Sequence, residues 1–116
     1  MDNEKVFAMS FAKVYPMLIA KAERKGRTWD EVLEVTSWRT GDTPGQIEAL
    51  LDSDTAYGDF FRKAPALNPN RTLIKGSICG IKVELIEDPL MQNIRYLDKL
   101  VDELAKGKAM EKILRK

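Results

Sequence analysis

The residues best suited to bind a ligand lie in one proline-containing loop and on one predicted helix. The loop, Asn68-Pro69-Asn70-Arg71, combines polar donors, a rigid turn and a guanidinium group. A guanidinium group can hold a carboxylate or phosphate through two parallel hydrogen bonds. A small-anion site is therefore one candidate, with the candidate ligand-binding residues Asn68, Asn70, Arg71, Arg95, Tyr96 and Lys99. The alternative is that Arg71 only fastens its own loop through hydrogen bonds to carbonyl groups.

Other side-chain chemistry is narrowly limited by the composition. The 116 residues include no histidine and a single cysteine, Cys79. Ser-His-Asp and Cys-His catalysis need an imidazole, and a Cys/His zinc site or an internal disulfide needs more than one cysteine. Cys79 stands beside Ile78 and near Ile81, and apolar surroundings make a thiol inert, so we expect it in the core. We predict no catalytic residue, no cofactor and no metal site.

The acidic clusters and the glycines have structural explanations. Asp52-Ser53-Asp54 lacks the glycine and the closing glutamate of a calcium loop, and it is predicted to cap a helix. Glu84, Glu87 and Asp88 precede the longest predicted helix, where negative charge favours the N-terminus. The glycines form no Walker or dinucleotide-binding pattern and are expected to end helices.

The formal net charge of +1 hides an uneven distribution along the chain. Residues 1–27 carry a net charge of +3, residues 28–60 carry −7 and residues 61–116 carry +5. One explanation is weak attraction between these segments in the folded protein. The other is a basic face that meets an anion, and it requires the cations to gather in three dimensions.

Two basic clusters make nucleic-acid binding a third class of function to consider. The first predicted helix closes with Lys21, Arg24, Lys25 and Arg27. The C-terminus contributes Lys106, Lys108, Lys112, Arg115 and Lys116. Against this class, the next helix begins Trp29-Asp30-Glu31, and its carboxylates would repel phosphates if the helix entered a groove. Cations near a helix C-terminus also stabilise the helix itself.

Apolar spacing and capping residues predict a series of short helices. The first runs from about residue 10 to residue 25, and Pro16 is expected to delay or kink it. Capping boxes at Thr28-Glu31 and Thr43-Gln46 predict the start of two more helices. A fourth helix is marked by the aromatic residues Tyr57, Phe60 and Phe61.

The clearest helix lies near the C-terminus. Asp88 and Pro89 are typical of a helix start, and the apolar stripe that follows predicts the longest helix, near residues 89–106. Two pairs on this helix have ion-pair spacing, Lys99 with Glu103 and Asp102 with Lys106. After Gly107, a last turn is predicted to dock on the body through Met110, Ile113 and Leu114.

The segment between the loop and the long helix is ambiguous. Residues 71–80 are predicted as a short helix that ends at Gly80. Residues 81–86 alternate apolar and polar side chains, which is typical of a strand, but we prefer an irregular turn with one helical turn. The alternative is a hairpin in which residues 72–78 pair with residues 81–86.

Length and hydropathy predict one soluble domain over residues 1–116. Hydrophobic residues make up 44% of the chain and charged residues 32%, which suits a core with a solvated surface. No apolar run approaches the length of about 20 residues that a membrane span needs. The first residues lack the pattern of a secretory signal, and the chain has one thiol, so we expect a cytoplasmic protein.

Most of the chain resembles a known bacterial family. The segments that carry the resemblance are Tyr15-Pro16, residues 21–27, residues 64–71, Cys79-Gly80, residues 86–92 and residues 94–108. They resemble a small bacterial family known as domain of unknown function 2200. The resemblance implies a compact all-helical domain in a bacterial cytoplasm and favours the helical interpretation of the ambiguous segment. It implies no activity, cofactor or catalytic residue, so no functional residue is carried over.

These observations predict an all-α fold, a compact orthogonal or irregular bundle of six to eight short helices. The preferred function is a non-catalytic binding or protein-interaction module, with a homodimer or another protein as the partner and no membrane. The first alternative is a small-anion binder or an enzyme that uses arginine, tyrosine and carboxylate groups. The second alternative is the nucleic-acid-binding module.

Overall fold

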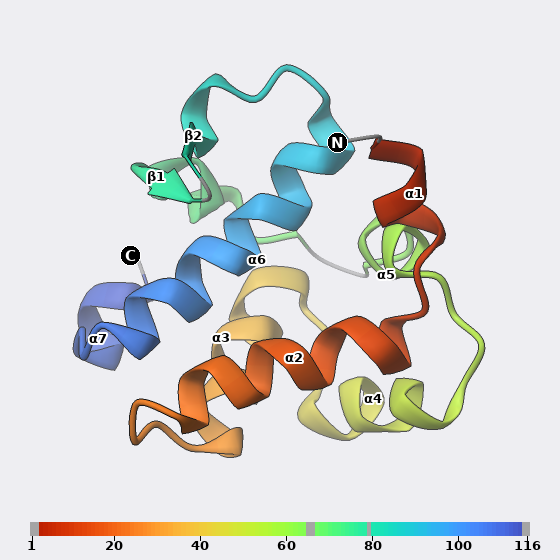
Figure 1. The fold of residues 1–116 in the computed structure, drawn as a ribbon, viewed down its shortest axis with the longest axis horizontal. Coiled ribbons are helices and arrows are strands. Elements are labelled where there is room, and N and C mark those ends of the chain that lie inside the picture. The colour runs from red at the N-terminus through yellow and green to blue at the C-terminus, as the bar shows by residue number, and fades with distance from the viewer. Residues whose placement is uncertain (1–2, 65–66, 79, 115–116) are drawn as a thin grey trace.

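A long helix near the C-terminus, α6, is the element around which the others pack (Figure 1). The computed structural model describes residues 3–64, 67–78 and 80–114. Its α-helices are α1 (Asn3–Ala8), α2 (Phe11–Glu23), α3 (Trp29–Thr40), α4 (Pro44–Ala49), α5 (Tyr57–Arg62), α6 (Pro89–Ala105) and α7 (Met110–Ile113). The short 3-10 helices are η1 (Leu50–Asp52), η2 (Pro69–Leu73) and η3 (Val83–Leu85), and the strands are β1 (Ser77–Ile78) and β2 (Ile81–Lys82). The predicted all-α fold is confirmed.

Helix α6 begins where the sequence predicts. The Asp88 side chain accepts hydrogen bonds from the backbone N–H groups of Leu90 (2.9 Å) and Met91 (3.1 Å), and Pro89 fills the first position. The buried face of α6 then packs against α2, α3 and α5, while β1, η3 and α7 contact it as well. Gly107, with a φ of 87°, follows the helix, and the chain turns back into α7.

Both predicted capping boxes are present. The Thr28 hydroxyl accepts from the Glu31 N–H (3.2 Å), and the Glu31 carboxylate accepts from the Thr28 N–H (2.9 Å), at the start of α3. Thr43 and Gln46 make the same reciprocal bonds at the start of α4. These bonds satisfy backbone donors that a helix N-terminus otherwise leaves free.

Thr28→Ala is expected to lower the free energy of unfolding by about 1 kcal/mol, because the Glu31 N–H loses its acceptor. Thr28 is exposed, so its truncation opens no cavity. Urea denaturation would measure the change, with the exposed Thr72→Ala as a control that stays within about 0.5 kcal/mol of the wild type. Equal stability of Thr28→Ala and the wild type would show that the box contributes nothing.

Helix α2 begins before Pro16, although a proline was expected to delay the start of the helix, and helix α1 precedes it. Pro16 lies inside α2, on an exposed face, and the helix nevertheless begins at Phe11. Ser10 forms a β-bridge with Ala56, and the Phe11 N–H donates to the Thr55 carbonyl (2.9 Å), which fixes this start. Helix α1 was not predicted, because its six residues are too short for a periodic signal.

The prediction that Asp52-Ser53-Asp54 caps the fourth helix is wrong. Helix α5 has Ala56 at its N-cap and no side-chain cap. The chain instead forms the turn η1 and then extends, because the Tyr57 N–H donates to the Met9 carbonyl (2.7 Å) across the α1–α2 junction. A long-range backbone contact therefore replaces the local cap.

The prediction of a helix over residues 71–80 is also wrong. The segment holds η2 and then an antiparallel hairpin, in which Ser77 pairs with Lys82 and Ile78 with Ile81. Gly76 and Gly80 have φ values of 113° and 79°, and an α-helix contains no such left-handed residues. The hairpin alternative is present, and η3 supplies the helical turn predicted within residues 81–86. Cys79 lies outside the described residues.

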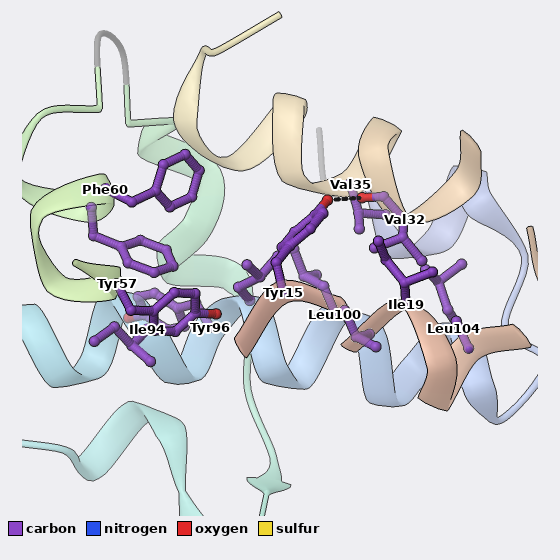
Figure 2. Packing of buried hydrophobic residues seen from close by; sticks show 14 of the residues in the cluster. Tyr15, Ile19, Val32, Val35, Tyr57, Phe60, Ile94, Tyr96, Leu100 and Leu104 are labelled. Atoms are coloured by element: carbon purple, nitrogen blue, oxygen red, sulfur yellow. Dashed lines mark hydrogen bonds between the residues drawn. The ribbon is translucent and has the colours of Figure 1, made fainter. Parts of the chain in front are cut away.

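The buried apolar side chains form one cluster between α6 and the helices that cover it. Figure 2 shows Tyr15 of α2 between α3 and α6, with its hydroxyl directed at the carbonyl of Val32. The same hydroxyl lies 2.7 Å from Thr36 Oγ1, so a buried polar pair is satisfied inside the cluster. Every helix within the described ranges is too short or too polar to span a membrane.

Candidate anion-binding groove

Arg71 is held within its own loop. Its Nη1 donates to the Asn68 carbonyl (3.0 Å), and its Nε donates to Asn93 Oδ1 on α6 (3.3 Å). Asn68 Oδ1 in turn accepts from the Asn70 N–H (2.9 Å). The three loop residues of the predicted site are therefore close together, and their contacts fasten η2 to α6.

The three predicted site residues on α6 contact different neighbours. Arg95 Nη1 donates to Asp98 Oδ2 (2.8 Å). Tyr96 is buried and lies under the guanidinium group of Arg39, whose Cζ is 5.5 Å from the ring centroid. Lys99 Nζ lies 3.7 Å from Asp102 Oδ2. These residues are neighbours in sequence, but each points to its own part of the structure.

The structure does not bring the two candidate guanidinium groups together. Arg71 meets α6 at Asn93, and Arg95 is two residues further along that helix. At 3.6 residues per turn, two residues are separated by about 200° around the helix axis. Asn93, which Arg71 contacts, and Arg95 therefore lie on opposite sides of α6, and none of the described hollows is lined by both arginines.

A buried arginine on α3 was missed from the sequence. Arg39 has no exposed surface, and its Nη2 donates to the Asn93 carbonyl (2.7 Å). Its Nε and Nη1 have no hydrogen-bond partner within the described part of the chain. Burial, followed by the charge of Arg71, lowers its pKa to about 10. The available signal was spacing, since Arg39 continues the buried positions 32, 35 and 36 of α3.

A hollow in the surface lies between the C-terminal ends of α2 and α6. Its volume is about 650 Å³, and the residues that line it are Lys21, Arg24, Lys25, Asp102, Ala105 and Lys106. We call this hollow the basic groove. The groove brings together Lys21, Arg24 and Lys25 of the first basic cluster and Lys106 of the C-terminal cluster. The charge distribution along the chain did not decide whether cations cluster in three dimensions, and the groove shows that four of them do.

Asp102 is the acidic residue of the basic groove, and it is surrounded by ammonium groups. Its carboxylate lies 3.0 Å from Lys106 Nζ and 3.3 Å from Lys21 Nζ, and the Lys106 contact is the predicted ion pair. Partial burial raises the pKa of Asp102, but Lys106 and Lys21 outweigh it and hold that pKa below its usual value. Asp102 therefore remains ionised and keeps the two ammonium groups at the groove wall.

Arg24 and Lys25 are the unpaired cations of the groove. Both side chains are exposed, and the described residues place no carboxylate within ion-pair distance of either. Arg27, from the same basic cluster, is used structurally, since its Nη1 donates to the carbonyl of Lys108 (2.7 Å) and its Nη2 pairs with Glu31 (2.7 Å). The cluster thus divides into residues that build the fold and residues that face solvent.

The groove keeps a positive charge after the helix ends are considered. Four cations and one carboxylate line it, which is a formal charge of +3. The C-terminal ends of α2 and α6 each contribute a partial charge equivalent to about −0.5. The cations therefore exceed the negative charges of the groove, and an incoming anion meets a positive field.

An acidic hollow lies on the other side of the α2–α3 connection. About 460 Å³ in volume, it lies on α3 and α4 and contains the carboxylates of Asp30, Glu34 and Glu48 beside Trp38. The turn that carries Arg24 and Lys25 leads directly into α3, whose first residues include Asp30 and Glu34 of the acidic hollow. Within the described residues, no group of three or more aspartate, glutamate or cysteine side chains is placed to hold a metal ion.

The fold and the groove define a small all-helical domain with a basic surface hollow. The chain belongs to the bacterial family described as "Uncharacterized protein conserved in bacteria (DUF2200)", whose model matches residues 5–115. The resemblance predicted from the sequence is therefore confirmed. A crystal structure of an uncharacterized protein, SP1917, is similar with 54% sequence identity and a TM-score of 0.93, over 98% of this chain and 93% of that one. No curated protein matches the chain.

Proposed function

We propose that this protein is a non-catalytic binding module whose basic groove holds an acidic segment of a partner protein. The observation that carries the proposal is that Lys106, far along the chain, joins Lys21, Arg24 and Lys25 around one hollow. Arg24 and Lys25 are the groups that would contact the partner, because both are exposed and no carboxylate of the described residues pairs with them. A guanidinium group binds a carboxylate bidentately, while an ammonium group acts as a point charge.

The lining of the groove supports binding rather than catalysis. Its side chains are three lysines, an arginine, an aspartate and an alanine. These include no imidazole, thiol or hydroxyl group that would act as a nucleophile or exchange protons near neutral pH. A volume of about 650 Å³ lies within the usual size of ligand sites and admits a short segment of chain.

An acidic protein segment suits the surface better than a nucleic acid does. A duplex is a long, evenly charged polyanion, and it would extend from the groove over the neighbouring carboxylates of Asp30 and Glu34. Like charges at short range oppose such a complex. A short acidic segment fits within the groove and avoids α3. The nucleic-acid class is therefore the second candidate, and the test below includes it.

Arg24→Glu/Lys25→Glu is expected to weaken binding of a fluorescent hexaglutamate peptide by about tenfold or more, since each reversal replaces attraction by repulsion. Fluorescence anisotropy would measure the dissociation constant. Lys13→Glu/Lys63→Glu is the matched control, because both lysines are exposed and lie outside the groove lining. The control is expected to bind within about threefold of the wild type.

The same titration distinguishes the competing accounts. Equal losses in the two double variants would show that overall charge, not the groove, attracts the peptide. A short DNA duplex of matched charge is expected to bind more weakly than the peptide. Tighter binding of the duplex, with a steep dependence on salt, would favour the nucleic-acid module instead.

A further inference from the structure

Asp102 lies at the centre of a group of three lysines. Its carboxylate is 3.0 Å from Lys106 Nζ, 3.3 Å from Lys21 Nζ and 3.7 Å from Lys99 Nζ. Lys21 and Lys106 line the basic groove, whereas Lys99 does not. A carboxylate paired with lysines is also the complex that an acidic ligand would form in the groove. The fold therefore already supplies one carboxylate to the lysines that a ligand needs.

We propose that Asp102 is an internal competitor of the basic groove, which an acidic segment displaces from Lys21 and Lys106 when it binds. This role of Asp102 rests on the proposed function, because it concerns how the same groove takes up its ligand. Arg24 and Lys25 meet the ligand first, since both are exposed and no carboxylate of the described residues pairs with them. The exchange of carboxylates on Lys21 and Lys106 then follows.

The two groove lysines can leave Asp102, because their side chains reach solvent. The Lys106 side chain is 70% exposed, and the Lys21 side chain is 37% exposed. Ion pairs of exposed lysines are weak, since water and salt screen them. A ligand carboxylate can therefore take the place of Asp102 on either lysine, and the ammonium group keeps a partner throughout.

Lys99 is the lysine that stays with Asp102 during the exchange. Its side chain is only 12% exposed, and it lies against the chain at Gly76, where a Cβ would be 3.1 Å from Lys99 Cε. Asp102 is partly buried, and a carboxylate that is shielded from water and left without a counter-charge is unfavourable. Lys99 provides that counter-charge when the other two lysines turn to the ligand. Lys99 thus acts on ligand binding through Asp102, as a positioning residue.

Fluorescence anisotropy with hexaglutamate as the probe tests this role. Asp102→Asn keeps the shape of the side chain and removes its charge, and it is expected to lower the dissociation constant by about tenfold. Asp59→Asn is the matched control, because Asp59 is also paired with a cation on its own helix, Arg62, and lies outside the groove lining. This control changes the net charge equally and is expected to bind within about threefold of the wild type.

Lys99→Met separates competition from simple attraction of charge. In the wild-type background, it is expected to raise the dissociation constant by about threefold or more, because Asp102 then holds Lys21 and Lys106 more tightly. In the Asp102→Asn background, the same substitution is expected to change the dissociation constant by less than about twofold, since no carboxylate remains to be released. A lysine that attracted the ligand by its charge alone would cause the same loss in both backgrounds.

Asp102→Asn is expected to fold, because the ion pairs that it removes are at the surface, and Asp102→Ala is a second variant with the same expected gain. The role of Asp102 is overturned if neither variant binds hexaglutamate more tightly than Asp59→Asn does, or if Lys99→Met has equal effects in both backgrounds. If binding is weakened by Arg24→Glu/Lys25→Glu but unchanged by Asp102→Asn, only the competition fails and the groove remains the binding site. Failure of both the wild type and Asp102→Asn to bind would overturn the proposed function as well.

Discussion

Arg39→Met is expected to raise the free energy of unfolding by about 1 to 3 kcal/mol. The reason is that Arg39 is a fully buried cation whose guanidinium group makes a single hydrogen bond to the described residues, from Nη2 to the Asn93 carbonyl. After burial, the largest effect on the pKa of Arg39 comes from the like charge of Arg71. Methionine has a similar volume, fills the same space and carries no charge to desolvate.

Two aromatic rings offset part of the cost of the Arg39 charge. Its Cζ lies 5.5 Å from the centroid of Tyr96 and 5.7 Å from that of Phe61. A cation over a ring gains about 0.5 to 2 kcal/mol. Lowering the pKa of a guanidinium group from 12.5 to about 10 corresponds to about 3 kcal/mol at neutral pH. The cost of burying the Arg39 charge is therefore similar to or larger than the gain from the two rings. Because Arg39→Met removes that cost, the variant is expected to be more stable than the wild type.

The pH dependence of Arg39→Met gives an independent check. The folded pKa of Arg39 lies below its unfolded value, so the penalty is fully present below about pH 10 and is relieved as the pH rises toward 12.5. The stability difference between variant and wild type is therefore expected to shrink above about pH 10. The buried Tyr15 and Tyr57 have raised pKa values and act oppositely. The contribution of Tyr15 is common to both proteins, whereas the Arg39 charge lowers the pKa of Tyr57, so loss of that charge raises the pKa of Tyr57 further and also reduces the stability difference at high pH.

Chemical denaturation of three variants tests the Arg39 prediction. Arg39→Ala is expected to lose about 2 to 4 kcal/mol, because truncation opens a cavity between Phe61 and Tyr96. Arg24→Met, at an exposed and unpaired position, should change stability by no more than about 0.5 kcal/mol. A loss of stability in Arg39→Met would mean that the ring contacts outweigh burial of the charge.

Gly58→Ala is expected to lower the free energy of unfolding by about 1 to 3 kcal/mol and to detach α1. Gly58, near the start of α5, lies directly beneath Phe7 of α1. A Cβ at this position would lie 2.8 Å from Phe7 Cβ and 3.0 Å from Phe7 Cα. Because a backbone atom is involved, no rotation of a side chain relieves the clash.

Gly45→Ala is the matched control for the clash. Gly45 lies in the first turn of α4, and a Cβ there meets no atom within 4 Å. Alanine has a better helix propensity than glycine, so this variant is expected to gain up to about 1 kcal/mol. Limited proteolysis should cut residues 1–10 faster in Gly58→Ala than in Gly45→Ala. Equal rates and equal stability would show that α1 can shift without cost.

Features that depend on a few adjacent residues were predictable from the sequence. The Thr28 and Thr43 capping boxes and the Asp88 cap are fixed by side chains within three residues of the backbone that they satisfy. The start of α5 depends instead on a backbone bond from Tyr57 to Met9, which no local pattern records. The hairpin at Gly80 was weighed but not preferred, because two-residue strands carry almost no alternation signal.

The residues of the candidate site could be predicted from the sequence, but their arrangement around one hollow could not. Lys21, Arg24, Lys25 and Lys106 all belong to basic clusters that the sequence makes evident, but only the packing of α2 on α6 places them around one hollow. The predicted combination of Arg71 with Arg95 assumed that residues near one helix face the same way. The rotation of the helix between Asn93, which Arg71 contacts, and Arg95 directs the two arginines to different sides of α6.

A titration of the ¹⁵N-labelled wild type with hexaglutamate, followed by amide chemical shifts, tests whether the basic groove binds an acidic segment. Saturable shifts are expected at the C-terminal ends of α2 and α6, centred on Arg24, Lys25 and Lys106, and they should disappear at high salt. Amides that border the acidic hollow at Glu34 and Glu48 should stay in place. Shifts spread over all exposed lysines, or no saturable shifts at the basic groove, would show that the groove is not a specific binding site.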